Sequence, residues 1–381
     1  MYNNGMERIY LDCASTTPTD NAIVEKMLPY FTDVFGNADS PHANGRKAMN
    51  AVDFSRDKLA KLLNAKPSEI YFTSGGTEAD NWAMFSGARA LKPLGRNKIL
   101  LSSIEHHAVL SSAEKLKEEG FVVEYIPVND GGRVELSVVK SLLDDTVGLV
   151  AVMAVNNETG VRQPVEEIAK LCKENGCLFF TDAVQLAPHE PIDVKALGVD
   201  MLSLSAHKFY GPKGVGALYI KSGVKTKGLI VGGEQERGLR GGTTNVPLVV
   251  GLSEAYEKVR KEMGETETRI SELKALFLRE LTSISDVTVN GDTDGAVLNV
   301  RFHGVSGTDF VYAMDLKGVS LSVGSACSSA SVKPSHVLMA MGRTEREAKE
   351  CVRFSLGKAT TEEEIVTVVR LIKETVEKLR G

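Results

Sequence analysis

Residues 177–208 read CLFFTDAVQLAPHEPIDVKALGVDMLSLSAHK and decide the fold. The stretch holds two apolar runs, at residues 177–180 and 199–204, and each has the length and composition of a buried strand. Ligands of an open parallel sheet bind at the carboxyl ends of its strands. Asp182 and Lys208 come soon after the two runs, so we expect both side chains at a ligand-binding edge.

The sequence around this stretch alternates strand and helix patterns from about residue 68 to residue 220. Strands are predicted at residues 70–72, 98–101, 122–126, 147–154 and 214–220. Helices are predicted to begin near residues 78 and 107 and to cover residues 136–143 and 165–173. This alternation predicts an α/β fold with a mostly parallel sheet covered by helices on both faces, and the strand at 214–220 is expected to be antiparallel.

The pattern changes after about residue 245. A long charged helix is predicted at about residues 247–281, and shorter strands and helices follow it. The last helix opens with Thr361 and Glu364 in capping-box spacing. The chain is too long for one typical domain. We expect a large sheet domain at residues 16–255 and a smaller α+β domain formed by residues 1–15 and 256–381.

The composition argues against several classes of protein. Hydrophobic residues make up 43% of the 381 residues, and the net charge of -5 gives no indication of nucleic-acid binding. The longest apolar run, residues 147–155, is far too short to span a membrane, and the first residues lack a secretory signal pattern. The five cysteines are scattered, without disulfide or zinc-site spacing. We therefore expect a cytoplasmic protein that binds no metal.

Asp182 and Lys208 together suit pyridoxal phosphate. The carboxylate of Asp182 could hold the protonated pyridine nitrogen, and the amine of Lys208 could form a Schiff base with the aldehyde. Taken alone, an aspartate after a strand is commonly a helix cap, and a lysine in a loop is usually a solvated surface charge. The pairing of the two, with Gln185 three residues after Asp182, favours the cofactor.

Three further motifs follow predicted strands. Gly75-Gly76-Thr77 opens a helix, where backbone N–H groups form an anion site, although glycine turns before helices are common. In the pair His106-His107, the flat ring of His107 could stack on a cofactor, and a structural histidine is the equally weighted alternative. Asn157 lies in a segment that a simple turn also explains, and its amide could donate to a phenolic oxygen.

A cysteine and an arginine are the remaining candidates. The segment SVGSACSSAS at residues 322–331 is small and polar and contains glycine, which predicts a loop. A cysteine there is expected to be exposed, whereas most free cysteines are buried. An exposed thiol in the cytosol is an oxidation liability unless it is used, so Cys327 is a candidate nucleophile. Arg353 lies in a predicted strand, where its guanidinium could hold a substrate carboxylate.

Taken together, these motifs resemble the cysteine desulfurases of the NifS/IscS type, within the class V aminotransferase family. The likeness covers nearly the whole chain. It is carried by LDCASTT at 11–17, GN at 36–37, TSGGTE at 73–78, EHH at 105–107, NNETG at 156–160, DAVQ at 182–185, SAHK at 205–208, ERGLRGGT at 236–243 and GSACSS at 324–329. The last motif resembles that of the first of the family's two groups, in which the cysteine lies on a longer, flexible loop. The resemblance implies the pyridoxal-phosphate-dependent transferase fold of the aspartate-aminotransferase type.

The resemblance assigns a role to each residue near the cofactor ring. Lys208 would be the Schiff-base lysine and the acid/base group. Asp182 would pair with the pyridine nitrogen, and His107 would stack on the ring and take part in catalysis. Asn157 and Gln185 would contact the ring substituents.

The other roles concern the phosphate, the substrate and a second subunit. The phosphate would be held by Gly76, Thr77, Ser205 and His207. Thr243 would reach the phosphate of the neighbouring subunit's cofactor, which implies a homodimer with shared active sites. Asn37 and Arg353 would bind the carboxylate of the substrate.

The resemblance also implies the reaction. The enzymes of this type convert L-cysteine to L-alanine, and Cys327 would take the sulfur as a persulfide. An acceptor or scaffold protein of iron–sulfur cluster assembly or a thiolation pathway would receive it. A selenocysteine lyase or another class V enzyme is the nearest alternative, and Cys327 favours a desulfurase over an aminotransferase. A non-catalytic binding protein on the same fold is a further alternative, against which the intact Lys208, Asp182 and Cys327 argue.

Overall fold

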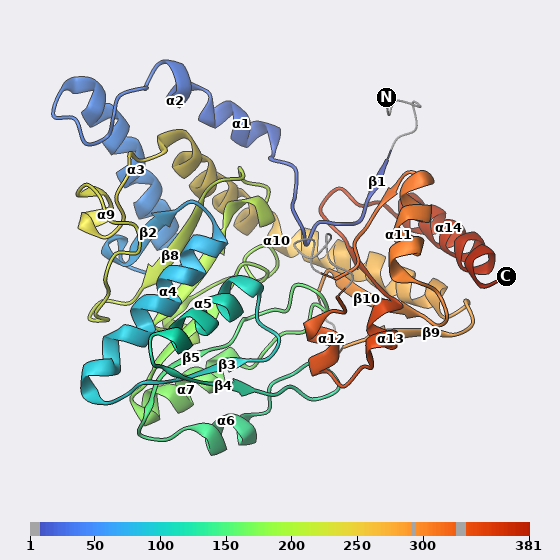
Figure 1. Ribbon diagram of the computed structural model, residues 1–381. Coiled ribbons are helices and arrows are strands. Elements are labelled where there is room, and N and C mark those ends of the chain that lie inside the picture. Colours follow the sequence, from blue (N-terminus) through green and yellow to red (C-terminus); the bar gives the residue numbers. More distant parts are fainter. Residues whose placement is uncertain (1–7, 292–294, 325–332) are drawn as a thin grey trace.

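A seven-stranded sheet forms the centre of the larger of two groups of elements (Figure 1). The computed structural model describes residues 8–291, 295–324 and 333–381. The strands of the sheet are β2 (Ile70–Thr73), β3 (Lys98–Ser102), β4 (Val122–Ile126), β5 (Val147–Ala151), β6 (Leu178–Asp182), β7 (Met201–Ser205) and β8 (Gly216–Ile220). They lie in the order β2-β8-β7-β6-β5-β3-β4. As predicted, β8 is antiparallel to its neighbours β2 and β7, and the other pairs are parallel.

Helices cover both faces of this sheet. Those from the first part of the chain are α1 (Asn21–Met27), α2 (Pro29–Thr32), α3 (Ala43–Leu62), α4 (Gly76–Leu91), α5 (His107–Glu118), α6 (Leu136–Leu142), α7 (Val165–Asn175), α8 (Val194–Leu197) and α9 (Gln235–Gly238), with short 3-10 turns η1 (Pro67–Glu69), η2 (Lys92–Leu94) and η3 (Ala206–Lys208). On β6, Phe180 packs with α4 and α5, whereas its neighbour Phe179 packs on the other side with α3 and α7. Both side chains are buried, which explains why the strands have continuous apolar sequences.

A second group of elements comes from the first strand and the last part of the chain (Figure 1). Its strands are β1 (Ile9–Tyr10), β9 (Val287–Asn290), β10 (Val297–Phe302), β11 (Val319–Ser320) and β12 (Cys351–Ser355), and its helices are α11 (Gly307–Leu316), α12 (His336–Ala340), α13 (Glu345–Lys349) and α14 (Glu362–Arg380). The strands β12, β10 and β9 form an antiparallel sheet, and β1 pairs with β11. The predicted capping box of Thr361 and Glu364 opens α14.

The helix α10 (Val246–Leu281) connects the two groups. Its first half packs in the core beside the large sheet, for example through Val249, and Phe277 near its end packs in the core of the second group. The predicted boundary between residues 255 and 256 falls inside this helix, and the division into domains stays a prediction.

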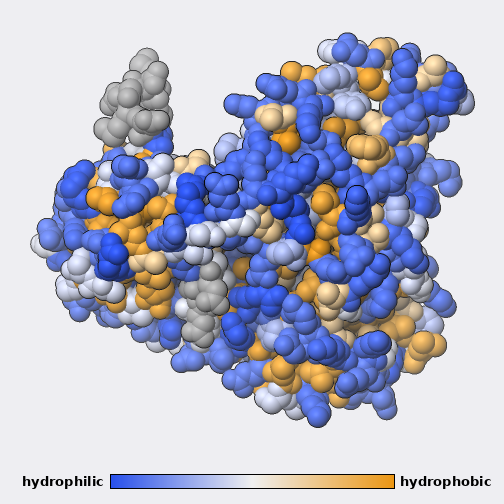
Figure 2. All heavy atoms as spheres, turned by 180° about the vertical axis from the view of Figure 1, so that it is seen from behind, coloured by the Kyte–Doolittle hydropathy of each residue, from blue (hydrophilic) through white to orange (hydrophobic). Residues whose placement is uncertain are grey.

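The surface is mixed in character. Figure 2, which shows the molecule from behind, has hydrophilic side chains over most of this face and apolar side chains in separate patches. Within residues 8–291, 295–324 and 333–381, every helix is too short or too polar to cross a bilayer.

Candidate active site

One cavity of about 200 Å³ brings together most of the predicted site residues. It is lined by Ala14, Ser15, Gly76, Thr77, Asp80, His106, Met153, Asn157, Asp182, Val184, Gln185, Ser205, His207, Lys208 and Arg353. The cavity lies where β6 and β7 end, because Asp182 and Ser205 are the last residues of these two strands. The site is therefore at the carboxyl ends of parallel strands, where the sequence predicts it.

Lys208 lies in the short turn η3 that follows β7. Its Nζ donates hydrogen bonds of 2.6 Å to the Ala14 carbonyl oxygen and 2.7 Å to that of Ser15. The two carbonyls belong to the segment that follows β1, so this segment and the large sheet meet at the amine. Gln185 contacts the same segment, since its Nε2 donates to the Ala14 carbonyl oxygen at 2.8 Å.

Asp182 ends β6 and is only 5% exposed. One carboxylate oxygen, Oδ1, accepts a 2.9 Å hydrogen bond from the Val184 backbone N–H. Burial raises the pKa of Asp182 to about 6, although this hydrogen bond and the charge of Lys208 lower it. The residue lines the cavity. Its carboxylate can therefore accept a further hydrogen bond from a bound molecule.

The first turn of α4 contributes Gly76 and Thr77 to the lining of the cavity. The N–H groups of a first helical turn have no acceptor within the helix. Gly75, which precedes the helix, has a φ of 154° that side-chain-bearing residues rarely adopt. A Cβ on Gly76 would lie 3.1 Å from Val184 Cγ2, so glycine keeps this end of the cavity open. Thr77 and Ser205 add hydroxyl groups to the lining.

His207 also lines the cavity. Its Nδ1 is 3.1 Å from the Thr16 hydroxyl oxygen. Burial, together with the nearby positive charges of Lys208 and Lys213, lowers the pKa of His207 to about 4. The ring is therefore neutral at physiological pH and can donate one hydrogen bond.

Arg353 reaches the cavity from β12, in the second group of elements. One terminal nitrogen donates to the Asn157 carbonyl oxygen at 2.9 Å, and the other donates to Asp12 Oδ1 at 2.8 Å and to Ser15 Oγ at 2.6 Å. Its Nε is buried and has no hydrogen-bond partner among the described residues. A buried donor without a partner suits an anionic ligand such as a carboxylate.

The cavity is lined by His106, whereas the prediction named His107. His106 caps the start of α5, and its Nδ1 accepts a 3.1 Å hydrogen bond from the Ala108 backbone N–H. Burial lowers its pKa to about 4, with smaller contributions from Lys208 and His107. The ring of His107 instead lies 4.7 Å from the ring of His336. Adjacent histidines at a helix start give no sequence signal that says which ring faces the cavity.

Four other residues complete the comparison with the sequence. Asn37 is exposed, and its Oδ1 accepts a 3.0 Å hydrogen bond from the Asp39 backbone N–H. Thr243 is also exposed, and neither residue lines the cavity. Cys327 lies outside the described residues. Asp80, a buried residue of α4 that lines the cavity, is absent from the predicted set.

The donors and acceptors of the cavity fit pyridoxal phosphate. The helix start with Thr77, Ser205 and His207 would hold the phosphate. Asp182 would accept the proton of the pyridine nitrogen, and Lys208 would attach to the aldehyde carbon. Within the described ranges, no group of three or more His, Cys, Asp or Glu side chains is placed to hold a metal ion.

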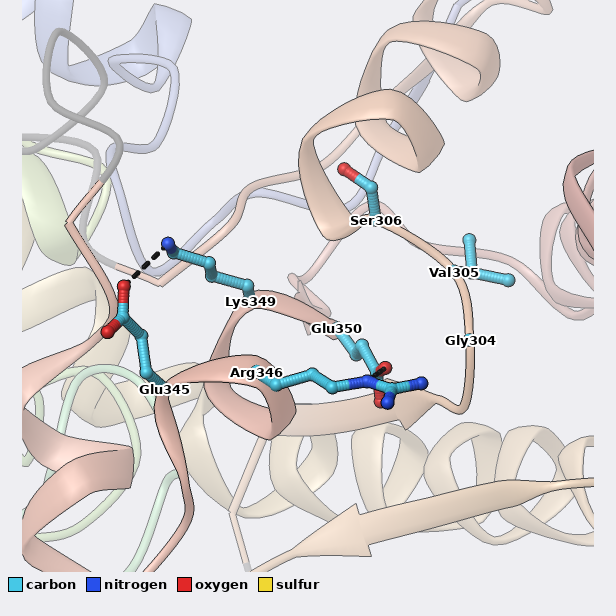
Figure 3. Close-up of a pocket in the computed structure, with 7 residues that line it drawn as sticks. All are labelled: Gly304, Val305, Ser306, Glu345, Arg346, Lys349 and Glu350. Carbon is cyan, nitrogen blue, oxygen red and sulfur yellow. Dashed lines mark hydrogen bonds and ion pairs between the residues drawn. The ribbon is translucent and has the colours of Figure 1, made fainter.

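A second, larger hollow of about 590 Å³ lies elsewhere (Figure 3). It is lined by Gly304, Val305, Ser306, Glu345, Arg346, Lys349 and Glu350. Its charged side chains pair with each other, at 2.7 Å between Lys349 and Glu345 and at 3.2 Å between Arg346 and Glu350. The charges of this hollow are therefore already compensated, and the active-site chemistry belongs to the first cavity.

A sheet with a buried aspartate and a lysine after neighbouring strands, and an anion site at a helix start, is the architecture of enzymes that depend on pyridoxal phosphate. Comparison with known proteins shows to which family within this class of enzymes the chain belongs. The chain belongs to the aminotransferase class-V family, whose model matches residues 9–368.

Individual relatives cover nearly the whole chain. The sequence is 44% identical to cysteine desulfurase IscS of Clostridium botulinum (strain Hall), over 98% of this chain and 96% of the relative. It is 45% identical to putative cysteine desulfurase IscS 1 of Bacillus subtilis (strain 168), over 98% of this chain and 100% of the relative. The solved structure of a NifS-like protein superposes with a TM-score of 0.92 at 36% identity, covering 98% of this chain and 100% of that one.

Proposed function

We propose that this protein is a pyridoxal-phosphate-dependent cysteine desulfurase, which converts L-cysteine to L-alanine and captures the sulfur. The observation that carries the proposal is the single cavity that holds Lys208, Asp182 and Arg353. An amine, a buried carboxylate and a buried guanidinium are the groups that an amino-acid substrate and this cofactor require. The class-V family and relatives named cysteine desulfurase support the same reaction.

Different residues of the cavity carry out substrate binding and proton transfer. The guanidinium of Arg353, which lines the cavity, binds the substrate carboxylate. The Nζ of Lys208 takes and returns the proton of the substrate α-carbon. When bound, the cofactor supplies an electron sink for that carbon. His106, as the histidine that lines the cavity, is our candidate for the ring contact that the sequence assigned to His107.

The sulfur step belongs to Cys327. Its thiolate attacks the sulfur atom of the substrate, the carbon–sulfur bond breaks, and the sulfur stays on the enzyme as a persulfide. The thiolate is the reactive form of a cysteine. An acceptor protein then takes the sulfur, and we propose one that serves iron–sulfur cluster assembly or thiolation in the cytoplasm.

The active form would be a homodimer. Thr243 is exposed and does not line the cavity of its own chain, which supports a role at the cofactor phosphate of the neighbouring subunit. Asn37, which is also exposed, would come close to the substrate carboxylate in the assembled site.

An absorbance spectrum tests the proposed function. The purified protein should have a visible band from bound cofactor, and L-cysteine should change this band while alanine and sulfide form in the presence of a thiol reductant. A band without alanine would move the proposal to another amino-acid substrate. The lack of a band after addition of pyridoxal phosphate would contradict the cofactor itself.

A further inference from the structure

Two buried carboxyl groups line the cavity and a third is buried nearby, and the proposed reaction uses one of the three. Asp182 is 5% exposed, Asp80 is 2% exposed and Glu105 is fully buried. Asp80 feels the negative charges of Asp182 and Glu105, and Glu105 feels that of Asp182. We call Asp80, Glu105 and Asp182 the carboxyl cluster, and the question is what Asp80 and Glu105 do there.

Asp80 is hydrogen-bonded to β7, the strand that pairs with the end of β6 at Asp182. It lies on α4 and lines the cavity. The Ser203 hydroxyl donates a 2.5 Å hydrogen bond to Asp80 Oδ1, and Ser203 lies opposite Asp182 in the register of β7 and β6. Asp80 thus connects α4, whose first turn would hold the phosphate, to the strand pair that carries the carboxylate for the pyridine nitrogen.

Glu105 makes its contacts on the other side of β6, at the ends of β3 and β5. It follows β3, and its Oε1 accepts hydrogen bonds from the Ser102 hydroxyl at 2.5 Å and from the Met153 backbone N–H at 2.7 Å. Its other oxygen, Oε2, is buried and has no hydrogen-bond partner among the described residues. A buried carboxylate with one bare oxygen is costly, so this arrangement suits a neutral carboxylic acid.

The surrounding charges favour ionisation of Asp182 over its two neighbours. Lys208 and the Val184 N–H act on Asp182 and stabilise its negative charge. The charges that act on Asp80 are those of Asp182 and Glu105, and Asp182 acts on Glu105. Burial first, and these like charges second, raise the pKa of Asp80 well above its ordinary value. Burial also raises the pKa of Glu105 to about 8, although the hydrogen bonds from Ser102 and Met153 lower it.

We propose that Asp80 and Glu105 are neutral positioning residues, which hold the end of β6 in place and leave the negative charge of the carboxyl cluster on Asp182. The inference deepens the proposed function and rests on it, because the charge on Asp182 matters only when a pyridine nitrogen faces it. Asp80 is the more informative member to test, since it both lines the cavity and contacts Ser203.

The test compares two substitutions at Asp80 in the holoenzyme. D80N keeps a neutral side chain whose oxygen accepts from Ser203, whereas D80A removes the contact. Serine 86 provides the matched control, because Ser86 is buried on the same helix and its hydroxyl donates to the Lys227 carbonyl oxygen at 2.8 Å. For each variant we would measure the dissociation constant of pyridoxal phosphate and the pH dependence of the visible cofactor band.

The proposal predicts rescue by the amide. D80N should keep the pH midpoint of the band and bind the cofactor within a few-fold of the wild-type protein. D80A should bind it about tenfold more weakly, the effect of losing one buried hydrogen bond, and S86A should match the wild type. A pH midpoint that moves in D80N would overturn the proposal, because Asp80 would then carry charge. Wild-type behaviour of D80A would also overturn it.

A substitution at Glu105 provides a second, independent test if D80A fails to fold. E105Q should leave the cofactor band and its pH midpoint unchanged, since the amide imitates the neutral acid, and a shifted midpoint would overturn the proposal. A wild-type protein without any cofactor band would instead contradict the proposed function, and the inference would fall with it. Wild-type and variant spectra therefore separate the two failures.

Discussion

At the scale of the residue, the site depends on a few charges placed within a buried environment. Asp182 keeps a pKa of about 6 because Lys208 and a backbone N–H offset part of the cost of burial. His106 and His207 are held neutral by burial and by nearby positive charge. The cavity thus combines one buried carboxylate with neutral rings and two cationic side chains, Lys208 and Arg353.

Lys208→Ala tests the amine directly. We expect the visible cofactor band to change and alanine formation to fall by about 10²–10⁴-fold, the usual contribution of a positioned acid/base group. Lys213→Ala is the control, because Lys213 is exposed and lies five residues further on. Both variants would be followed by absorbance and by alanine assay. Equal activity in the wild type and the Lys208 variant would remove Lys208 from the mechanism.

Glu105→Gln tests the neutral acid through stability. The folded-state pKa of Glu105 is raised to about 8, so its contribution to stability is present at low pH and is lost as the pH rises through 8. The difference in unfolding free energy between E105Q and the wild type should grow in favour of E105Q by about 1.4 kcal/mol per pH unit between pH 5 and 8. Denaturant unfolding at several pH values measures it. A constant difference across this range would mean that the pKa of Glu105 is not raised in the folded protein.

At the scale of the element, strand ends and one helix start create the site. The sequence predicted these elements because buried parallel strands give continuous apolar runs that end at polar residues. It predicted Asp182 and Lys208 together because the ends of neighbouring parallel strands meet at one edge. It did not predict Asp80, since a polar residue inside α4 becomes a cavity residue only through the packing of α4 against β7.

The start of α4 depends on Gly75. Its φ of 154° is rare for any other residue, and a Cβ there would meet no atom within 4 Å, so a substitution acts through the backbone alone. Gly75→Ala should lower the unfolding free energy by about 1–3 kcal/mol and weaken cofactor binding.

A helical glycine provides the contrast. Gly264 lies within α10 and also has no atom within 4 Å of a built Cβ. Gly264→Ala should raise the unfolding free energy by about 0.5–1 kcal/mol, because alanine loses less conformational freedom in a helix. Denaturant unfolding and cofactor titration would compare the two variants, and equal effects of both would contradict the role of the Gly75 backbone.

At the scale of the whole molecule, the cavity joins both groups of elements, since Lys208 follows the large sheet and Arg353 comes from β12. Two predicted residues, Asn37 and Thr243, are exposed and do not line the cavity. A single chain's sequence pattern contains no information about which surfaces a second copy covers. These two positions therefore came from the resemblance, and the dimer that would use them stays a proposal.

Mixing two inactive variants tests the shared site. In a heterodimer of K208A and T243A chains, one site would contain both Lys208 and the partner's Thr243, and the other would contain neither. We therefore expect mixed, exchanged dimers to recover part of the activity that each variant lacks alone. Recovery measured by alanine formation would support the homodimer, and no recovery despite subunit exchange would contradict the role of Thr243.

The most direct test of the central claim is the fate of the substrate sulfur. Purified holoenzyme would react with L-cysteine without reductant, and mass spectrometry would then examine the peptide that contains Cys327. The account predicts that this peptide gains one sulfur atom while an equal amount of alanine forms, and that C327A forms neither product although it keeps its cofactor band. Alanine formation without added sulfur on Cys327, or unchanged activity of C327A, would contradict the account.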